Sequence, residues 1–433
     1  MTCLWNPLRP VNRLPPEILA LCAAFVPRTD PKPIVSLAHV CRYWREAITS
    51  NPGSWTLIGN KWERLVPLCL ERAGVAPLTV DLWIGGLKRK FVHALLPHVT
   101  RISSLSLTAC TSLKDMEDFL SSPMLNPTSL KFKSPYWPEI HLYPILSNIK
   151  SVVELNLTSY KIPFKELIRF LESNPCIERL ELFIMFTNAP ALTTLERAVS
   201  IPRLRHLALT CYSNHATDAR ALLSSLSLPR GINIEIHEAE HESRGDLASF
   251  LPSPPTFIQD ILAPIITVKD LCFEGRLHLS GNDGSFSFHS PKVSKNHYEY
   301  FDMFATGAVR EFHLHLGWRD PPPLLLEQLP ALEALLINQT RPRRGLLSVL
   351  AEDPVLCPSL KTIVLFNCLE TDAEIKQLEE ISEKREHSIA ARLHRIVIVN
   401  HTQDFPKLDS VSRLRMLVPR VDFVVGNELP DLL

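Results

Sequence analysis

The sequence lacks the features that mark several common classes of protein. Lysine plus arginine and aspartate plus glutamate both number 46, so the formal net charge is zero. A chain without net charge has no global field that would draw it to nucleic acid or to an anionic membrane. No apolar run reaches the ~18 residues that a membrane-spanning helix requires, because proline or a charged residue interrupts each candidate. We therefore expect a soluble protein whose partners are proteins, with no nucleic acid and no membrane among them.

The sequence also shows neither closely paired cysteines nor, in its first residues, the pattern of a secretory leader. The 10 cysteines are scattered without a C-x-x-C pair, and the opening MTCLWNPLRPVN shows no basic segment followed by an apolar one. These absences predict reduced thiols and a location in the cytoplasm, the nucleus or both. Glycine is scarce, and no glycine-rich phosphate loop, G-x-S-x-G motif or spaced carboxylate pair occurs. We expect no enzymatic activity and no cofactor.

Thirty-six prolines separate short apolar segments that share one spacing. The template has apolar residues at positions 0, +3, +5 and +8, and its units recur at 25-residue intervals before the spacing loosens. The units are centred on Leu105, Leu130, Leu155, Leu180, Leu207, Ile234, Leu271, Phe312, Leu335, Ile363, Ile396 and Val421. A chain of 433 residues exceeds one ordinary core, which suits an elongated repeat structure. We predict a short parallel strand at each L-x-L, with the leucines pointing inward.

This repeat resembles the leucine-rich repeat, whose pattern L-x-x-L-x-L-x-x-N/C is met by ISSLSLTAC (Ile102–Cys110) and LKTIVLFNC (Leu360–Cys368). The resemblance implies an α/β fold: an irregular solenoid over residues 83–433 with short parallel strands and outer helices. Asn-Asp-Gly between two alternating runs predicts a hairpin insertion at about 276–290. Helical spacing is found between strands in DMEDFLSS, FKELIRFLES, TLERAVS and EIKQLEEISEKREHS, and the run EEISEKREH should be a solvated face. An ordinary parallel α/β domain is the alternative.

Residues 12–58, before the repeats, follow a helical period instead. Pro15-Pro16 can open a helix that runs to about Phe25, and Asp30-Pro31 precedes a longer helix that ends near Asn51. The second helix carries two neighbouring apolar stripes: Ile34, Leu37, Cys41, Trp44 and Ile48, and beside them Val40, Tyr43 and Ala47. Fewer than about 50 residues cannot bury two wide apolar faces, so one face is expected to need a partner.

Three blocks of this segment, LPPEIL, VCRYWREAI and NPGSW, resemble the F-box. The F-box is the helical module by which a substrate receptor binds the Skp adaptor of a cullin-RING ubiquitin ligase. Residues 59–82 resemble the linker helix and first strand that follow the F-box in fungal-type members. The resemblance implies a three-helix domain over residues 12–58, with adaptor contacts by Leu14, Pro15, Pro16, Ile18, Val40, Trp44 and Trp55. Leu37, Cys41 and Trp55 could instead form the core of the module, and for single residues both interpretations stay open.

The two resemblances together imply the substrate-recognition subunit of a Skp-cullin-F-box ubiquitin ligase. The F-box would bind the Skp adaptor and, through it, cullin, while the repeats would bind an unknown protein substrate. A leucine-rich-repeat scaffold without a ligase role is the first alternative. A zinc hydrolase is a remote one, because HEAEH (His237–His241) matches H-E-x-x-H. That motif needs a helix, whereas the preceding INIEI predicts a strand, so we expect no metal site.

Residues that alternate with the inward leucines should form the other face of each strand. They are polar in the early units, as at Lys131 and Lys133, but apolar in the late ones. The candidate substrate-binding residues are Leu336, Val364, Phe366, Val397 and Val399, which would form an apolar patch over three neighbouring strands. The alternative is that these strands are covered on both faces, since buried parallel strands carry continuous apolar runs.

Overall fold

The computed structural model combines α-helices with mainly parallel β-sheet, which confirms the mixed α/β class. The chain divides into two compact units, Met1–Leu204 and Arg205–Leu433. The structure describes residues 14–24, 32–83, 89–108, 119, 122, 127–133, 149–158, 162–187, 198–239, 247–252, 261–262, 264–271, 276–281, 284–289, 304, 306–316, 323–339, 345–366, 372–400 and 408–425. None of the helices in these ranges is both long and apolar enough to cross a bilayer.

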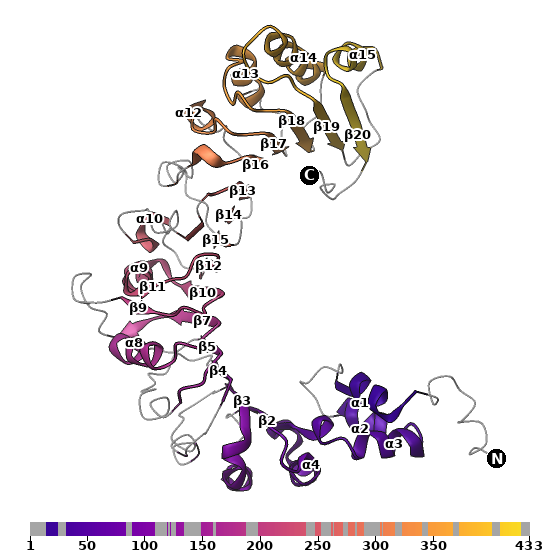
Figure 1. Ribbon diagram of the computed structural model, residues 1–433, viewed down its shortest axis with the longest axis vertical. Helices are drawn as coiled ribbons and strands as arrows, with labels where there is room; N and C mark the ends of the chain where they lie inside the picture. The colour runs from indigo at the N-terminus through magenta and orange to yellow at the C-terminus, as the bar shows by residue number, and fades with distance from the viewer. Residues whose placement is uncertain are drawn as a thin grey trace, which may run out of the picture. The chain divides into compact units, whose positions relative to one another are not determined.

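Unit 1 opens with a helical module. Its elements are α1 (Pro16–Ala24), α2 (Lys32–Ala38), α3 (Arg42–Thr49) and the 3-10 helix η3 (Pro52–Trp55). Both α1 and α2 pack on α3, and the three helices group together in Figure 1. Helix α1 begins at Pro16, where the fixed φ of proline and its missing N–H cost nothing.

The second, long helix predicted for this module is in fact two helices. Cys41 has an extended backbone, with φ −161° and ψ 176°, so helical geometry stops between α2 and α3. Arg45 Nε donates a hydrogen bond of 3.1 Å to the carbonyl of Ala38, which satisfies an acceptor at the end of α2. The predicted apolar stripe from Ile34 to Ile48 is therefore interrupted at Cys41.

A mixed segment joins this module to the sheet of unit 1. It contains β1 (Leu57–Gly59), the 3-10 helix η4 (Asn60–Leu65), α4 (Val66–Ala73) and β2 (Leu78–Trp83). Helix α4 packs on η3 and on β1. Gly74 ends α4 with φ +52°, a backbone conformation that other residues adopt only with strain.

The sheet of unit 1 is parallel, in the order β1-β2-β3-β4-β5-β7. The further elements are α5 (Arg89–Leu95), η6 (Leu96–Arg101), β3 (Ile102–Thr108), β4 (Ser129–Lys133), β5 (Glu154–Thr158), α8 (Phe164–Ser173), β7 (Arg179–Ile184), the short pair β6 (Ile162–Pro163) and β8 (Phe186–Thr187), and β9 (Val199–Ser200). Leu105, Leu130, Leu155 and Leu180 lie opposite one another in β3, β4, β5 and β7, and all four are buried. The 25-residue spacing thus places equivalent leucines in register, as predicted for these strands.

Polar side chains also join neighbouring repeats of this sheet across the same 25-residue interval. The side chain of Asn174, fully buried after α8, donates a hydrogen bond of 3.0 Å to the carbonyl of Ile149. Thr128 Oγ1 donates to the carbonyl of Ser103 at 3.0 Å. Each hydrogen bond satisfies a backbone acceptor of the preceding repeat, so polar as well as apolar residues fix the stacking of the repeats.

The sheet of unit 2 has the order β10-β12-β15-β14-β13-β16-β17-β18-β19-β20. Its elements are β10 (His206–Cys211), η8 (Ser213–His215), α9 (Ala216–Ser225), β11 (Leu226–Ser227), β12 (Asn233–Glu238), α10 (Leu247–Phe250), β13 (Thr267–Leu271), β14 (Arg276–Ser280), β15 (Ser285–His289), η11 (Thr306–Ala308), β16 (Glu311–Leu316), α12 (Pro323–Glu327), β17 (Ala334–Gln339), α13 (Gly345–Glu352), β18 (Thr362–Phe366), α14 (Asp372–Glu386), β19 (Arg395–Asn400), α15 (Leu408–Leu417) and β20 (Arg420–Val425). The residues Phe312, Leu335, Ile363, Ile396 and Val421 lie in register across β16 to β20. Figure 1 shows α13, α14 and α15 together on one face of the last strands.

An antiparallel insertion interrupts the parallel order of unit 2. Strand β14 pairs antiparallel with both β13 and β15. Val268, rather than the predicted centre Leu271, lies opposite Phe312 in the pairing of β13 with β16. The template missed this shift because both residues are apolar and three positions apart.

The helices expected between strands occur in part. FKELIRFLES is α8 itself, and EIKQLEEISEKREHS overlaps most of α14. TLERAVS was predicted as helix, but its last two residues form strand β9, where the β-branched Val199 is buried. DMEDFLSS lies outside the described residues except for Phe119 and Ser122.

The charged run EEISEKREH was predicted to form a solvated face, but one of its residues is buried. Arg385 of α14 is fully buried, and burial lowers the pKa of its guanidinium. Its donors reach six backbone carbonyls at 2.9–3.5 Å, those of Pro354, Leu356, Cys357, Pro358, Leu360 and Ala391. The loop between α13 and β18, in which Cys357 has a positive φ of 50°, is therefore held by one arginine.

Candidate functional site

The helical module buries a small core and leaves several apolar side chains in solvent. Leu19 and Ile48 are fully buried between α1 and α3. Ile18 and Leu21 on α1 are 40% and 56% exposed, and Val40 in the turn after α2 is 55% exposed. Such side chains lose hydrophobic free energy in water, and burying one fully gains about 1.5 to 3 kcal/mol. The module is therefore suited to bind a protein partner through α1 and the turn before α3.

The seven predicted adaptor-binding residues do not share one environment. Pro15, Pro16, Ile18 and Val40 are exposed, whereas Leu14 and Trp44 are half-buried. Tyr43 Oη donates a hydrogen bond of 2.7 Å to the carbonyl of Leu14, which ties the start of the module to α3. Leu37 and Cys41, the alternative core residues, are also half-buried.

Trp55 is the exception among the predicted contact residues, because it lies in the core. Its side chain is 3% exposed, and its indole N–H donates to the carbonyl of Ile48 at 2.9 Å. The guanidinium carbon of Arg72 in α4 lies 4.4 Å from the centre of the Trp55 ring. This cation–π contact and the hydrogen bond make Trp55 a link between α3 and α4 rather than a surface residue.

Leu21 is an exposed apolar residue that the sequence comparison with the F-box did not single out. It follows Ile18 by three positions on the same helix, so the two side chains lie on one side of α1. That spacing was the available signal, since an apolar pair at i and i+3 marks one helical face.

The five predicted substrate-binding residues are not exposed. Leu336, Val364, Phe366, Val397 and Val399 form one cluster, in which each side chain is at most 7% exposed, and the partly buried Val424 packs against it. These strands are therefore covered on both faces, the alternative that their continuous apolar runs had left open. The cluster is core in this structure, and a role in substrate binding stays without support from its exposure.

The HEAEH string does not form a helical metal site within the described residues. His237 and Glu238 belong to strand β12, and Glu240 and His241 lie outside the part that the structure describes. His237 Nε2 lies 3.3 Å from Glu235 Oε2, and its ring stacks edge-on against His289 at 5.9 Å. Among the described residues, no group of three or more histidine, cysteine or acidic side chains could hold a metal ion.

A comparison with protein families gives the helical module a family name. Residues 11–54 match the model of the F-box domain, and the matched stretch includes α1, α2 and α3. A search of the curated proteins found no match. F-box domains in general bind the Skp adaptor of ubiquitin ligases. The match supports an F-box protein, with a role as adaptor or in substrate recognition in a ubiquitin ligase.

Proposed function

We propose that this chain is the substrate-recognition subunit of a Skp-cullin-F-box ubiquitin ligase. The F-box match at residues 11–54 carries the proposal. The exposed apolar residues Ile18, Leu21 and Val40 support it, because they provide the kind of surface that a tight protein partner would cover. Through the Skp adaptor the chain would be joined to cullin.

The rest of the chain would hold the protein to be ubiquitinated. Parallel strands at 25-residue intervals, with leucines in register, support an irregular leucine-rich-repeat-like solenoid. The polar faces of β3, β4 and β5 are half-buried to exposed and would be open to a protein ligand.

The contribution to ubiquitin transfer would be proximity rather than chemistry. A bound substrate lysine near the charged conjugating enzyme reacts at a high effective concentration, so no residue of this chain needs to react and no cofactor is needed. The transfer itself would be performed by other subunits. Free thiols at Cys22, Cys41, Cys69, Cys176, Cys211 and Cys357 support a reducing location, the cytoplasm or the nucleus.

The adaptor contact can be tested with Ile18→Asp combined with Leu21→Asp. A carboxylate at each exposed position leaves the core of the module intact but places charge on the proposed contact face. We expect co-purification with the Skp adaptor to fall at least tenfold while the unfolding transition stays unchanged. The matched control is Val75→Asp with Ile389→Asp, at two highly exposed apolar positions outside the F-box, and it should keep full binding. Undiminished binding by the first variant would contradict the proposal.

A second experiment separates a ligase receptor from a scaffold that only binds the adaptor. The chain is affinity-purified from cells with the proteasome inhibited, beside a form that lacks Leu14–Trp55. A ligase receptor should capture cullin together with ubiquitinated proteins, and the shortened form should keep the proteins but lose their ubiquitin chains. Capture of adaptor without cullin would instead identify a scaffold.

A further inference from the structure

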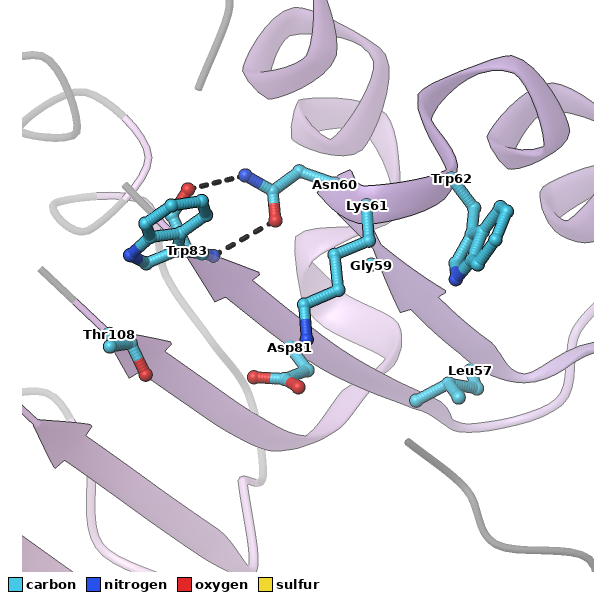
Figure 2. A pocket seen from close by; sticks show the side chains of 8 residues that line it. All are labelled: Leu57, Gly59, Asn60, Lys61, Trp62, Asp81, Trp83 and Thr108. Atoms are coloured by element: carbon cyan, nitrogen blue, oxygen red, sulfur yellow. Dashed lines mark hydrogen bonds between the residues drawn. The ribbon is translucent and has the colours of Figure 1, made fainter. Parts of the chain in front are cut away.

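A pocket of about 360 Å³ lies at the β1 end of the sheet of unit 1. Residues of β1, η4, β2 and β3 line it, among them two tryptophans, one lysine and one aspartate (Figure 2). Its volume falls within the range of about 300 to 1,000 Å³ that is usual for ligand pockets. The pocket lies outside the F-box match, so adaptor binding does not account for it.

One side of the pocket is an indole on a fixed backbone. Trp83 ends strand β2 and is 49% exposed. The side-chain amide of Asn60 pairs with the main chain of Trp83 in both directions: Nδ2 donates to the carbonyl, and Oδ1 accepts from the N–H at 2.9 Å. Figure 2 shows these two hydrogen bonds to the Trp83 backbone. The clamp holds the end of β2, so the Trp83 ring is presented to a ligand at a small entropic cost.

The pocket also contains a carboxylate and an ammonium group of unequal mobility. Asp81 is half-buried on the central part of β2, whereas Lys61 on η4 is exposed. Figure 2 shows the ammonium end of Lys61 turned toward the Asp81 carboxylate, but no ion pair joins the two, and neither forms an ion pair with any other described residue. A lysine on the surface has a flexible stem that can turn into solvent, but the carboxylate is fixed by its strand.

We propose that this pocket binds an arginine side chain of a protein ligand, with the guanidinium stacked on Trp83 and paired to Asp81. The face of an indole attracts cations, and a carboxylate beside it adds a charge-assisted hydrogen bond. Arginine suits both contacts better than lysine, because its planar group stacks and binds a carboxylate through two N–H donors. The ammonium group of Lys61 would repel the guanidinium, and its flexible stem lets it turn into solvent when the ligand enters. The inference rests on the proposed receptor function and specifies which substrates that receptor would hold.

Because Asp81 and Lys61 carry opposite charges, their substitution should change arginine binding in opposite directions. The probes are fluorescent, capped heptapeptide pools that differ only in the central residue: arginine, citrulline, lysine or glutamate. Citrulline has nearly the shape of arginine without its charge. Anisotropy with the purified full chain should show the arginine pool binding about tenfold more tightly than the citrulline pool. Asp81→Asn should remove that preference, Trp83→Ala should weaken arginine binding about fivefold, and Lys61→Ala should strengthen it about threefold.

Matched variants away from the pocket and from the polar face of unit 1 are Glu380→Gln and Lys384→Ala, which carry the same types of charge on α14 of unit 2 and should change nothing. A preference for glutamate that Lys61→Ala abolishes would overturn the proposal in favour of an acidic ligand. Equal binding of all pools, or no binding up to about 1 mM, would overturn it as well. Because the assay contains neither adaptor nor ligase, its failure would leave the F-box function standing, and loss of adaptor binding would leave its result unchanged.

Discussion

An inner column of apolar residues runs across strands β3 to β5 of unit 1, and a similar column runs across β17 to β19 of unit 2. The two sets of strands differ on their other face. In unit 1 that face carries Ser106, Lys131 and Asn156, which lie opposite one another and are half-buried. In unit 2 the equivalent positions are Leu336, Val364 and Val397, all of them buried. The same apolar template therefore gives a sheet with one buried face in unit 1 and strands that are buried on both faces in unit 2.

This difference changes where a ligand can be recognised. An apolar strand face is a docking surface only if it is exposed, and continuous apolar runs are instead typical of strands covered on both sides. The polar face of unit 1 is half-buried to exposed, and the Trp83 pocket lies beside β3. For the receptor function that we propose, β2 to β5 therefore offer a more accessible surface than β17 to β19.

The largest loss of stability is expected from a charge placed on the buried strand face of unit 2. Val397→Lys places an ammonium group at a fully buried position of β19, where desolvation has no compensating partner in the apolar cluster. We expect unit 2 to lose about 5 kcal/mol or more of stability, measured by urea denaturation with hydrogen exchange to assign the loss to one unit. The matched change in unit 1, Ser106→Lys, should cost less than about 0.5 kcal/mol. A similarly small loss of stability in both variants would show that both strand faces are solvated.

Arg385 provides a second contrast, between a buried and an exposed arginine of the same unit. Arg385→Met removes the donors of six loop carbonyls and should destabilise unit 2 by about 3 to 5 kcal/mol, since the freed carbonyls of Cys357 and Leu360 stay buried. Arg413→Met on α15 removes only an exposed ion pair with Glu383 and should change stability by less than about 1 kcal/mol. Thermal denaturation of both variants measures the difference, and similar melting points would disprove the structural role of Arg385.

Trp55→Phe tests the link between the F-box and the segment that follows it. Phenylalanine fills most of the space but cannot donate to the Ile48 carbonyl, and it attracts Arg72 less strongly. We expect a loss of about 1 to 2 kcal/mol with adaptor binding retained, because the residue is core. Loss of adaptor binding at unchanged stability would return Trp55 to the contact surface.

Residue spacing predicted the strands of this fold better than it predicted the surfaces. The in-register leucines follow from the 25-residue spacing of the early repeats, and α8 follows from its own helical spacing of apolar residues. Burial of one strand face requires such regular spacing. Exposure of the other face depends on what covers it, which no local pattern records. The antiparallel insertion shifted one register from Leu271 to Val268 for a related reason, since alternation specifies strands but not partners.

Single residues were predictable only where chain neighbours decide their environment. Ile18 and Val40 are exposed, whereas Trp55 is buried by α3 and α4, and their predicted adaptor contacts stay predictions. The buried role of Arg385 could not be read from EEISEKREH, because its acceptors lie 25 or more residues earlier in the chain, apart from Ala391. Tertiary contacts of this kind override the usual exposure of charged residues.

The smallest expected effect concerns the polar face of unit 1, at Lys131→Val. This change copies the apolar character of the β17–β19 face onto β4. The exposed ion pair between Lys131 Nζ and Glu154 Oε2, at 3.5 Å, is worth about 0.2 to 1 kcal/mol in water. Valine adds strand propensity but gains little burial on an open face, so the net change should stay within about 0.5 kcal/mol. A double-mutant cycle with Glu154→Gln, followed by urea denaturation, isolates the pair. A stabilisation above about 1.5 kcal/mol would mean that the valine is buried on β4. The strand faces of the two units would then differ only in the polarity of their side chains and not in their burial.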